Sequence, residues 1–168
     1  MPLSDYLPLP GPLVENIGNF RSGTPVRPLS CQEAAIGVLI CFESIFPELA
    51  REWTVSGANL LVNITNDAWF GRSSAPWQHL SMSVFRAVEN RRSLARSANT
   101  GVSAVVDPLG RIIEASPLFE PFYLVADVPL LQITTIFSGF GHHFGLLCLL
   151  ACIPLALLKR DVNKRREA

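Results

Sequence analysis

The chain has 168 residues, which is enough for one domain with a hydrophobic core. Its formal net charge is zero, but nine arginines and twelve acidic residues give positions 1–158 a charge of −3, and positions 159–168 carry +3. The main body has no basic face with interleaved aromatic residues, so the sequence gives little support to nucleic-acid binding. The four cysteines form no CxxC pair and no Cys/His cluster with metal-ligand spacing, which argues against a disulfide framework or a zinc site.

Residues 1–28 are rich in proline and glycine, and this composition predicts an irregular, extended segment. The segment lacks a basic start and a continuous apolar stretch, so we do not interpret it as a signal peptide. Its one aspartate, Asp5, fits a solvated loop acid as well as a functional carboxylate.

An apolar run at residues 34–40 is rich in branched side chains and predicts a buried strand. Pro47 then opens a helical pattern that ends near Gly57. Cys41 therefore lies between a strand and a helix, where backbone N–H groups can stabilise a thiolate or an oxyanion. The alternative is a buried structural cysteine, because free cysteine is among the most buried residue types.

The middle of the chain predicts a layered arrangement of helices and strands. A short strand at residues 60–64 precedes a helix at residues 78–90, in which Leu80, Val84, Ala87 and Val88 share one side and Arg86 and Glu89 lie outside. A turn at residues 108–110 joins two of the later strands into a hairpin. Helices beside alternating strands predict an α/β or α+β layered domain. The later strand candidates are residues 93–98, 102–107, 112–115 and 123–128.

The predicted loop at residues 67–77 contains three aromatic side chains: Trp69, Phe70 and Trp77. Aromatic residues beside a suspected nucleophile favour a site for an acyl chain, although the same residues are also suited to cap the core.

Residues 144–158 contain no charged side chain, and the apolar character extends back to Ile133. Because a membrane span needs roughly 20 apolar residues, we predict an approach and transmembrane helix at residues 133–158. The basic tail at residues 159–168 favours an anchored helix with a cytoplasmic tail and with the preceding domain outside. A buried core helix is the alternative.

Three stretches of this chain resemble the nitrilase superfamily, and within it the apolipoprotein N-acyltransferases. They read Cys-Phe-Glu-Ser-Ile-Phe-Pro-Glu from Cys41, Asn-Asp-Ala-Trp-Phe-Gly from Asn66, and Arg-Ser-Ala-Asn-Thr-Gly from Arg96. The resemblance keeps its order along the whole chain. It implies a partial nitrilase-like α-β-β-α sandwich at residues 1–132, followed by the predicted membrane helix.

The resemblance also implies a chemistry. Cys41 matches the nucleophile and Glu43 a supporting carboxylate, while Asp5, Phe42, Trp69, Phe70 and Trp77 fall in substrate-binding stretches. In that family a glutamate base and a lysine assist the cysteine, and both lie upstream of the stretch that matches Met1. The two lysines of this chain, Lys159 and Lys164, follow the apolar run, so neither is expected at Cys41. Arg91 or Arg92 would offer a charge there, although a guanidinium is not equivalent to an ammonium.

The implied reaction moves a fatty acyl group from phospholipid through a Cys41 thioester to the amine of a diacylglyceryl-cysteine lipoprotein, without a metal or organic cofactor. The implied location is the bacterial inner membrane, with the domain in the periplasm. Three interpretations stay open at this point. The chain is a fragment that is inactive alone, a fragment that complements an N-terminal half in trans, or a nonenzymatic membrane-anchored module.

Overall fold

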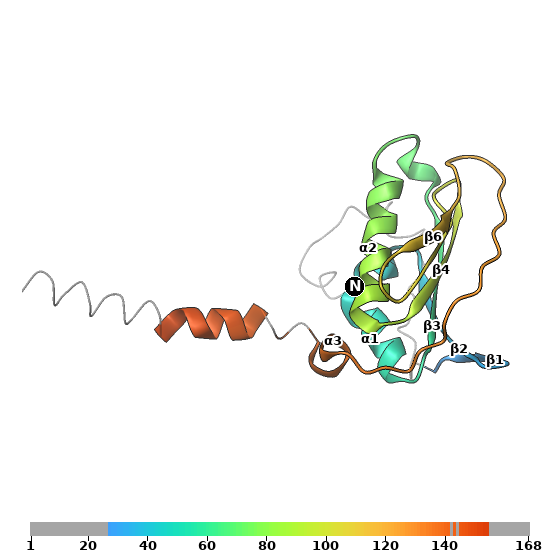
Figure 1. The fold of residues 1–168 in the computed structure, drawn as a ribbon. Coiled ribbons are helices and arrows are strands. Elements are labelled where there is room, and N and C mark those ends of the chain that lie inside the picture. The colour runs from blue at the N-terminus through green and yellow to red at the C-terminus, as the bar shows by residue number, and fades with distance from the viewer. Residues whose placement is uncertain (1–26, 142, 144, 155–168) are drawn as a thin grey trace, which may run out of the picture.

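The computed structural model describes residues 27–141, 143 and 145–154, and its centre is a single mixed sheet with the strand order β1-β2-β3-β4-β5-β6 (Figure 1). Two helices, α1 (Pro47–Val55) and α2 (Ala75–Asn90), connect the central strands. The strands are β1 (Leu29–Cys31), β2 (Ala34–Ile40), β3 (Leu60–Asn66), β4 (Ser93–Asn99), β5 (Ala104–Val106) and β6 (Ile112–Ala115).

Strands β2, β3 and β4 are parallel, and the other pairings in the sheet are antiparallel. Helix α1 links β2 to β3, and helix α2 links β3 to β4. Successive right-handed crossovers that advance in one direction place their helices on one face of a sheet. Figure 1 shows α1 and α2 on the same face of the sheet. Because β2, β3 and β4 are parallel, their carboxyl ends lie at one edge of the sheet.

The main core lies between this face of the sheet and the two helices. Leu39, Leu61 and Leu94 point from neighbouring parallel strands and are fully buried against Ala50 of α1 and Ala87 of α2. Alternate residues of a strand face opposite sides of the sheet, so these leucines all lie on the side that faces the helices. The other side is less covered, since Ile40 is 63% exposed and Ile64 is 53% exposed.

The layered α/β prediction is confirmed in its main elements. The strand at residues 34–40, the helix that begins at Pro47 and the hairpin around residues 108–110 are all present. The strand predicted at residues 123–128 is wrong, because this segment has no regular secondary structure and pairs with no described strand. On α2, Arg86 was predicted to face outward and Val88 to face the core, but Arg86 is buried and Val88 is 37% exposed.

The segment after residue 135 contains the short helix α3 (Ile136–Phe140), whose N-terminal Thr135 accepts a hydrogen bond from the Ser138 N–H. Gly141 ends α3 with a φ of 65°, and residues 143 and 145–154 are helical again. Within the described part of the chain, no helix has the length and apolarity that crossing a bilayer requires. Residues 142, 144 and 155–158 of the predicted span lie outside the described residues, as do Asp5 and the basic tail. The predicted division at residue 132 therefore stays a prediction.

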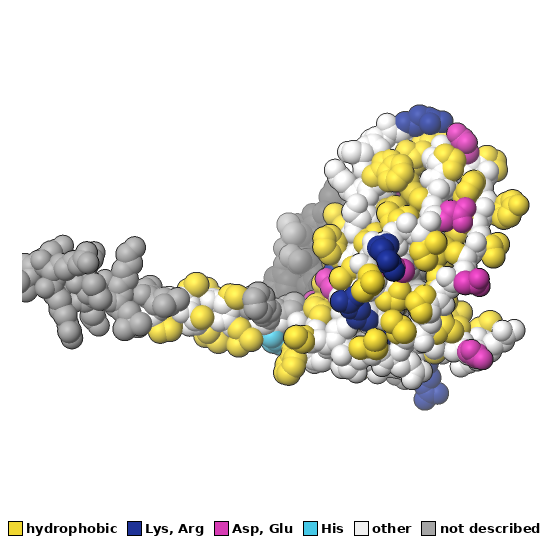
Figure 2. Space-filling view, viewed as in Figure 1, with side chains coloured by type: hydrophobic (Ala, Val, Ile, Leu, Met, Phe, Trp, Pro, Cys, Tyr) yellow, Lys and Arg dark blue, Asp and Glu magenta, His cyan; other side chains and the backbone are white. Residues whose placement is uncertain are grey.

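The exposed surface carries many hydrophobic side chains. Figure 2 shows them spread over the face that includes β6 and the segment after it. Ile112 and Ile113 of β6 are about half exposed, and Tyr123 and Val125 are exposed by 87% and 85%. A pocket of about 800 Å³ on this side is lined by Arg91, Asp107, Arg111 and apolar residues, and neither Cys41 nor any of the predicted aromatic site residues lines it.

Candidate active site

Cys41 is the first residue after β2 and opens the 3₁₀ turn η2 (Cys41–Ile45). Its φ of +52° lies in the left-handed region, which costs a residue other than glycine about 1 kcal/mol or more. The side chain is half-buried and lies at the carboxyl edge of the parallel strands. The structure therefore presents the Cys41 thiol on a strained turn at the sheet edge and does not bury it as a structural cysteine.

The Cys41 side chain lines a pocket of about 360 Å³. The pocket wall is largely apolar and includes Trp69, which belongs to the short 3₁₀ turn η3 (Ala68–Phe70) and is 77% exposed. The aromatic loop therefore reaches the predicted nucleophile through Trp69. The remaining wall comes from the ends of β2 and β3: Ile40, Ile64, Thr65 and Asn66.

Glu43 folds back onto the strand that precedes it. Its Oε2 accepts a hydrogen bond of 2.7 Å from the backbone N–H of Ile40. A carboxylate that binds the last N–H of β2 stabilises the tight turn in which Cys41 sits. Whether Glu43 also acts on a substrate stays a prediction.

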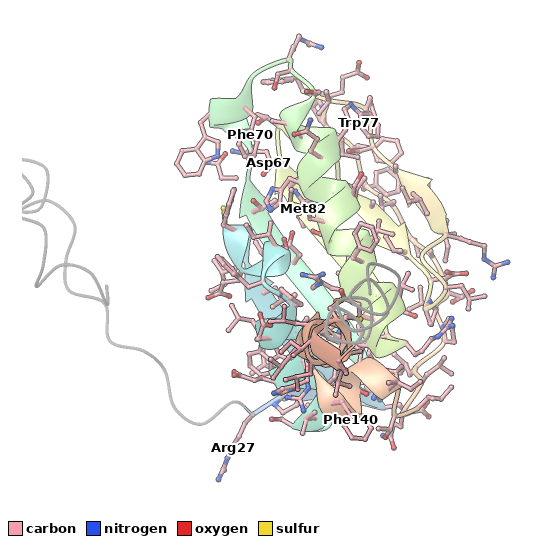
Figure 3. The ribbon with its side chains drawn as sticks, turned by 90° about the vertical axis from the view of Figure 1, so that its left-hand side faces the viewer. Arg27, Asp67, Phe70, Trp77, Met82 and Phe140 are labelled. Carbon is pink, nitrogen blue, oxygen red and sulfur yellow. The ribbon has the colours of Figure 1, made fainter. Side chains whose placement is uncertain are left out.

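The other predicted aromatic residues, Phe42, Phe70 and Trp77, do not line the Cys41 pocket. Phe42 and Phe70 both contact the ring of His79, with ring centroids 5.4 Å and 6.0 Å away. Trp77 belongs to α2, is 47% exposed and does not line the Cys41 pocket. Figure 3 shows Trp77 on the far side of α2 from Phe70, so the structure does not bring Trp77 to the nucleophile.

A buried ion pair lies beneath the Cys41 turn. Arg96 of β4 donates from Nη2 to Asp67 Oδ2 at 2.8 Å, and both side chains are fully buried. Arg96 Nη1 also donates to the side-chain oxygen of Asn63 and to Ser83 Oγ. Burial lowers the pKa of Arg96, and the Asp67 carboxylate opposes that shift. A paired, fully bonded guanidinium of this kind keeps its charge inside a core.

His79 of α2 links this ion pair to the nucleophile turn. Its Nδ1 lies 3.1 Å from Asp67 Oδ1, and its Nε2 lies 3.2 Å from Ser44 Oγ in η2. Nδ1 also lies 3.0 Å from Arg96 Nη2. Nδ1 therefore has an acceptor, Asp67, and a donor, Arg96, as neighbours, and the hydroxyl of Ser44 is suited to donate to Nε2 or to accept from it. Burial lowers the pKa of His79, as does the Arg96 charge, while Asp67 raises it.

The Cys41 carbonyl oxygen is the point where the polar network meets the nucleophile. Asn63 Nδ2 donates to this oxygen at 3.2 Å and to the Leu39 carbonyl at 2.9 Å. Ser44 Oγ also lies 3.2 Å from the Cys41 oxygen. Two side chains from different elements therefore hold the peptide that follows the left-handed residue.

The structure does not place Arg91 or Arg92 at Cys41. Both precede β4 and lie near the amino ends of the parallel strands, whereas Cys41 follows the carboxyl end of β2. Arg92 is buried, and it donates to four backbone carbonyls: those of Ala58, Asn90, Arg91 and Ile133. The arginines near the nucleophile turn are Arg96, beneath it, and Arg86, which donates to the Ile45 carbonyl of η2 at 2.8 Å; the sequence predicted neither of them there.

The sequence matches known proteins over most of its length. The carbon-nitrogen hydrolase family matches residues 6–136. The chain belongs to the carbon-nitrogen hydrolase family. The apolipoprotein N-acyltransferase of Geobacter metallireducens is 46% identical to this chain over 158 residues. The match covers 94% of this chain and 30% of that protein. Apolipoprotein N-acyltransferase 1 of Treponema denticola is 40% identical over 144 residues, which covers 84% of this chain and 26% of that protein.

These matches confirm the resemblance to apolipoprotein N-acyltransferases. The part of each of these two relatives that matches this chain is less than a third of the relative's length. Among solved structures, Nit3 of Saccharomyces cerevisiae, a member of the nitrilase superfamily, superposes with a TM-score of 0.52 at 24% identity, covering 60% of this chain and 40% of that one. The likeness supports a nitrilase-like fold for the described domain.

Proposed function

We propose that this chain is part of an N-acyltransferase that carries a fatty acyl group on Cys41. The observation that carries the proposal is the position of Cys41 itself, on a left-handed turn at the carboxyl edge of three parallel strands and open to an apolar pocket with Trp69. Ligands of open α/β sheets bind at this edge. The names of the relatives supply the class of substrate, a lipid-modified protein.

The proposed reaction has two steps. The Cys41 thiolate attacks the ester carbonyl of a phospholipid, a thioester forms, and a lysophospholipid alcohol leaves with the proton that the thiol gave up. The amine of a diacylglyceryl-cysteine lipoprotein then attacks the thioester, forms an amide and returns a proton to the thiol. The pocket beside Trp69 accommodates apolar acyl carbons. The roles proposed for Asp5, Phe42, Glu43, Phe70 and Trp77 belong to the same hypothesis.

Within the described residues, no lysine lies near Cys41, and the nearby charged pair of Asp67 and Arg96 is already committed to internal hydrogen bonds. We therefore propose that the proton acceptor for Cys41 and the ammonium for the oxyanion come from sequence that corresponds to the remainder of the relatives. The half-exposed apolar side of the sheet, with Ile40 and Ile64, supports a second layer at that place.

The same observation favours the second candidate, in which the chain is a half-domain that complements an N-terminal half in trans. A nonenzymatic membrane-anchored module is the remaining alternative. In each case the proposed location is the bacterial inner membrane, with the domain in the periplasm and the basic tail in the cytoplasm.

A chimera tests the proposal. This chain replaces the matching 158-residue segment of the Geobacter metallireducens relative, in cells depleted of their own apolipoprotein N-acyltransferase. The expected result is N-acylated lipoprotein and a hydroxylamine-labile acyl adduct on the chimera, both lost in Cys41→Ser. Glu114→Gln, an exposed change on β6, is the control that keeps both. An adduct that persists in Cys41→Ser overturns the assignment, and a correctly folded chimera without any adduct favours the nonenzymatic module.

A further inference from the structure

We propose that His79 is a positioning residue that couples the Cys41 turn to the aromatic loop, so that the reactivity of the thiol depends on how His79 is held. The proposal rests on the proposed function for its biological meaning, since it assumes that the thiol is the nucleophile. Its physical content concerns the thiol alone and can be measured without acyl transfer.

His79 contacts both segments through its ring and through its nitrogens. On the side of the nucleophile turn, its ring contacts the tilted ring of Phe42 and it hydrogen-bonds to Ser44. On the side of the loop, it contacts Phe70 edge to face and hydrogen-bonds to Asp67, the residue before η3. The His79 side chain is 3% exposed, so a movement of either segment is transmitted through packed atoms.

The Ser44 hydroxyl is the connection to the nucleophile. Its oxygen lies 3.2 Å from His79 Nε2 and 3.2 Å from the Cys41 carbonyl oxygen. A hydroxyl has one proton, so Ser44 donates to one of these acceptors at a time. When Nε2 of His79 carries no proton, it competes with the Cys41 carbonyl for the Ser44 proton. When Nε2 is protonated, it donates to Ser44 Oγ, and the Ser44 proton is then free to bind the Cys41 carbonyl.

The charges around His79 define when that change occurs. Asp67, which follows β3, and Arg96 on β4 face Nδ1, and the uncharged backbone carbonyl of Cys41 lies on the Nε2 side. Asp67 and Arg96 form an ion pair with each other and so offset one another at the ring. The state of His79 therefore depends on burial and on the integrity of this pair.

Four thiols are present in the chain, so the test uses a parent in which Cys31, Cys148 and Cys152 are serine. The rate of Cys41 alkylation by iodoacetamide is measured across pH, with circular dichroism to confirm folding. His79→Asn retains a donor at the position of Nδ1 for Asp67 and loses the group that faces Ser44. His79→Gln retains a polar group at the position of Nε2 and loses the bond to Asp67.

We expect His79→Asn and Ser44→Ala to change the alkylation rate of Cys41 by about tenfold, as the loss of one hydrogen bond to the turn predicts, with His79→Gln closer to the parent. Combining His79→Asn with Ser44→Ala adds little, because both remove the same connection. Identical alkylation profiles in the parent, His79→Asn and Ser44→Ala overturn the proposal.

A second measurement addresses the loop. Phe70 does not line the Cys41 pocket, but it contacts His79 and also Trp69, which does line it, so the comparison of two His79 backgrounds separates these two routes to the thiol. We expect Phe70→Leu to alter Cys41 alkylation in the His79 protein and not in His79→Asn, while Phe85→Leu, an exposed change on α2, has no effect in either. An equal effect of Phe70→Leu in both backgrounds contradicts the coupling.

If a substitution at His79 prevents folding of the chain, the Phe70 and Ser44 variants are measured in the Geobacter chimera, with the same expectations. The outcomes separate the two proposals. Altered alkylation without any acyl adduct leaves the coupling standing and removes the acyltransferase function. An acyl adduct on Cys41 with unaltered alkylation rates supports the acyltransferase function and overturns the coupling through His79.

Discussion

Arg96 Nη2 lies 2.8 Å from Asp67 Oδ2, and neither side chain is exposed to solvent. The pair joins the end of β3 to the middle of β4 beneath the turn that carries Cys41. Removing one member of a buried pair strands the other charge in the core, which costs about 3–5 kcal/mol. The stability of the domain is therefore expected to depend on this ion pair.

Asp67→Asn is expected to lower the free energy of unfolding by about 3 kcal/mol or more, because Arg96 loses its carboxylate. Urea unfolding followed by circular dichroism measures the change. Glu114→Gln removes one negative charge from the exposed surface of β6 and serves as the control, with an effect of about 0.5 kcal/mol or less. Equal effects of the two substitutions would contradict the structural role of the pair.

Gly101→Ala is expected to destabilise the domain by roughly 1–3 kcal/mol, because a Cβ at this position would lie 2.4 Å from Asp67 Oδ2. The same change at Gly139, in α3, meets no atom within 4 Å and is expected to be neutral or mildly stabilising. Thermal melts of both variants decide the matter. A Gly101→Ala protein as stable as its parent would show that Asp67 can move away from Arg96.

Lowering the pH is expected to destabilise the fold through His79. Its pKa is lowered from the model-compound value of 6.5 by burial and by Arg96, so the unfolded chain takes up a proton before the folded one. Stability is therefore full above pH 6.5 and falls as the pH drops from 6.5 to the folded pKa, with no further loss from this group below it. Urea unfolding of the parent and of His79→Gln across this range isolates the contribution, and parallel pH profiles would refute it.

Arg92→Met is expected to cost about 2–4 kcal/mol, because four backbone carbonyls lose a charged donor inside the domain. Arg91→Met, at the neighbouring position, removes a single long contact of 3.4 Å to the Pro108 carbonyl and is expected to have little effect. Both variants are compared in chemical unfolding. Comparable losses would mean that the buried carbonyls find other donors.

Periodicity predicted the elements that bury one side of a strand or helix. Residues 34–40 alternate correctly between the two faces of β2, and the helix that begins at Pro47 presents Ala50 to the core. The segment 123–128 has strand-like residues but pairs with no described strand, and Tyr123 and Val125 stay exposed. Strand propensity is realised only where a neighbour completes the ladder.

The site was predictable only in part. A cysteine between a strand and a helix is visible in the sequence, and so are the aromatic residues beside it. The network beneath it was not, since Arg96 bonds to partners 29 and 33 positions away, and no local pattern marks such pairs. Arg86 lies on the same helix as His79 and was expected to face solvent, whereas nothing was predicted for His79. A buried polar residue on an amphipathic helix is recognised only when its distant partners are known.

The alternation of side chains along β3 makes the spacing of its residues important for the site. Asn63 and Thr65 face the helices because each lies an even number of positions after Leu61, which packs against them, and both side chains bond to the network beneath Cys41. Deleting one residue early in β3 would turn both side chains to the outer surface, since the side-chain period of a strand is two. The thiol turn would then lose its support although every residue that acts in the chemistry remained in place. Spacing within β3 is therefore as strict a requirement for a reactive Cys41 as the identity of any side chain around it.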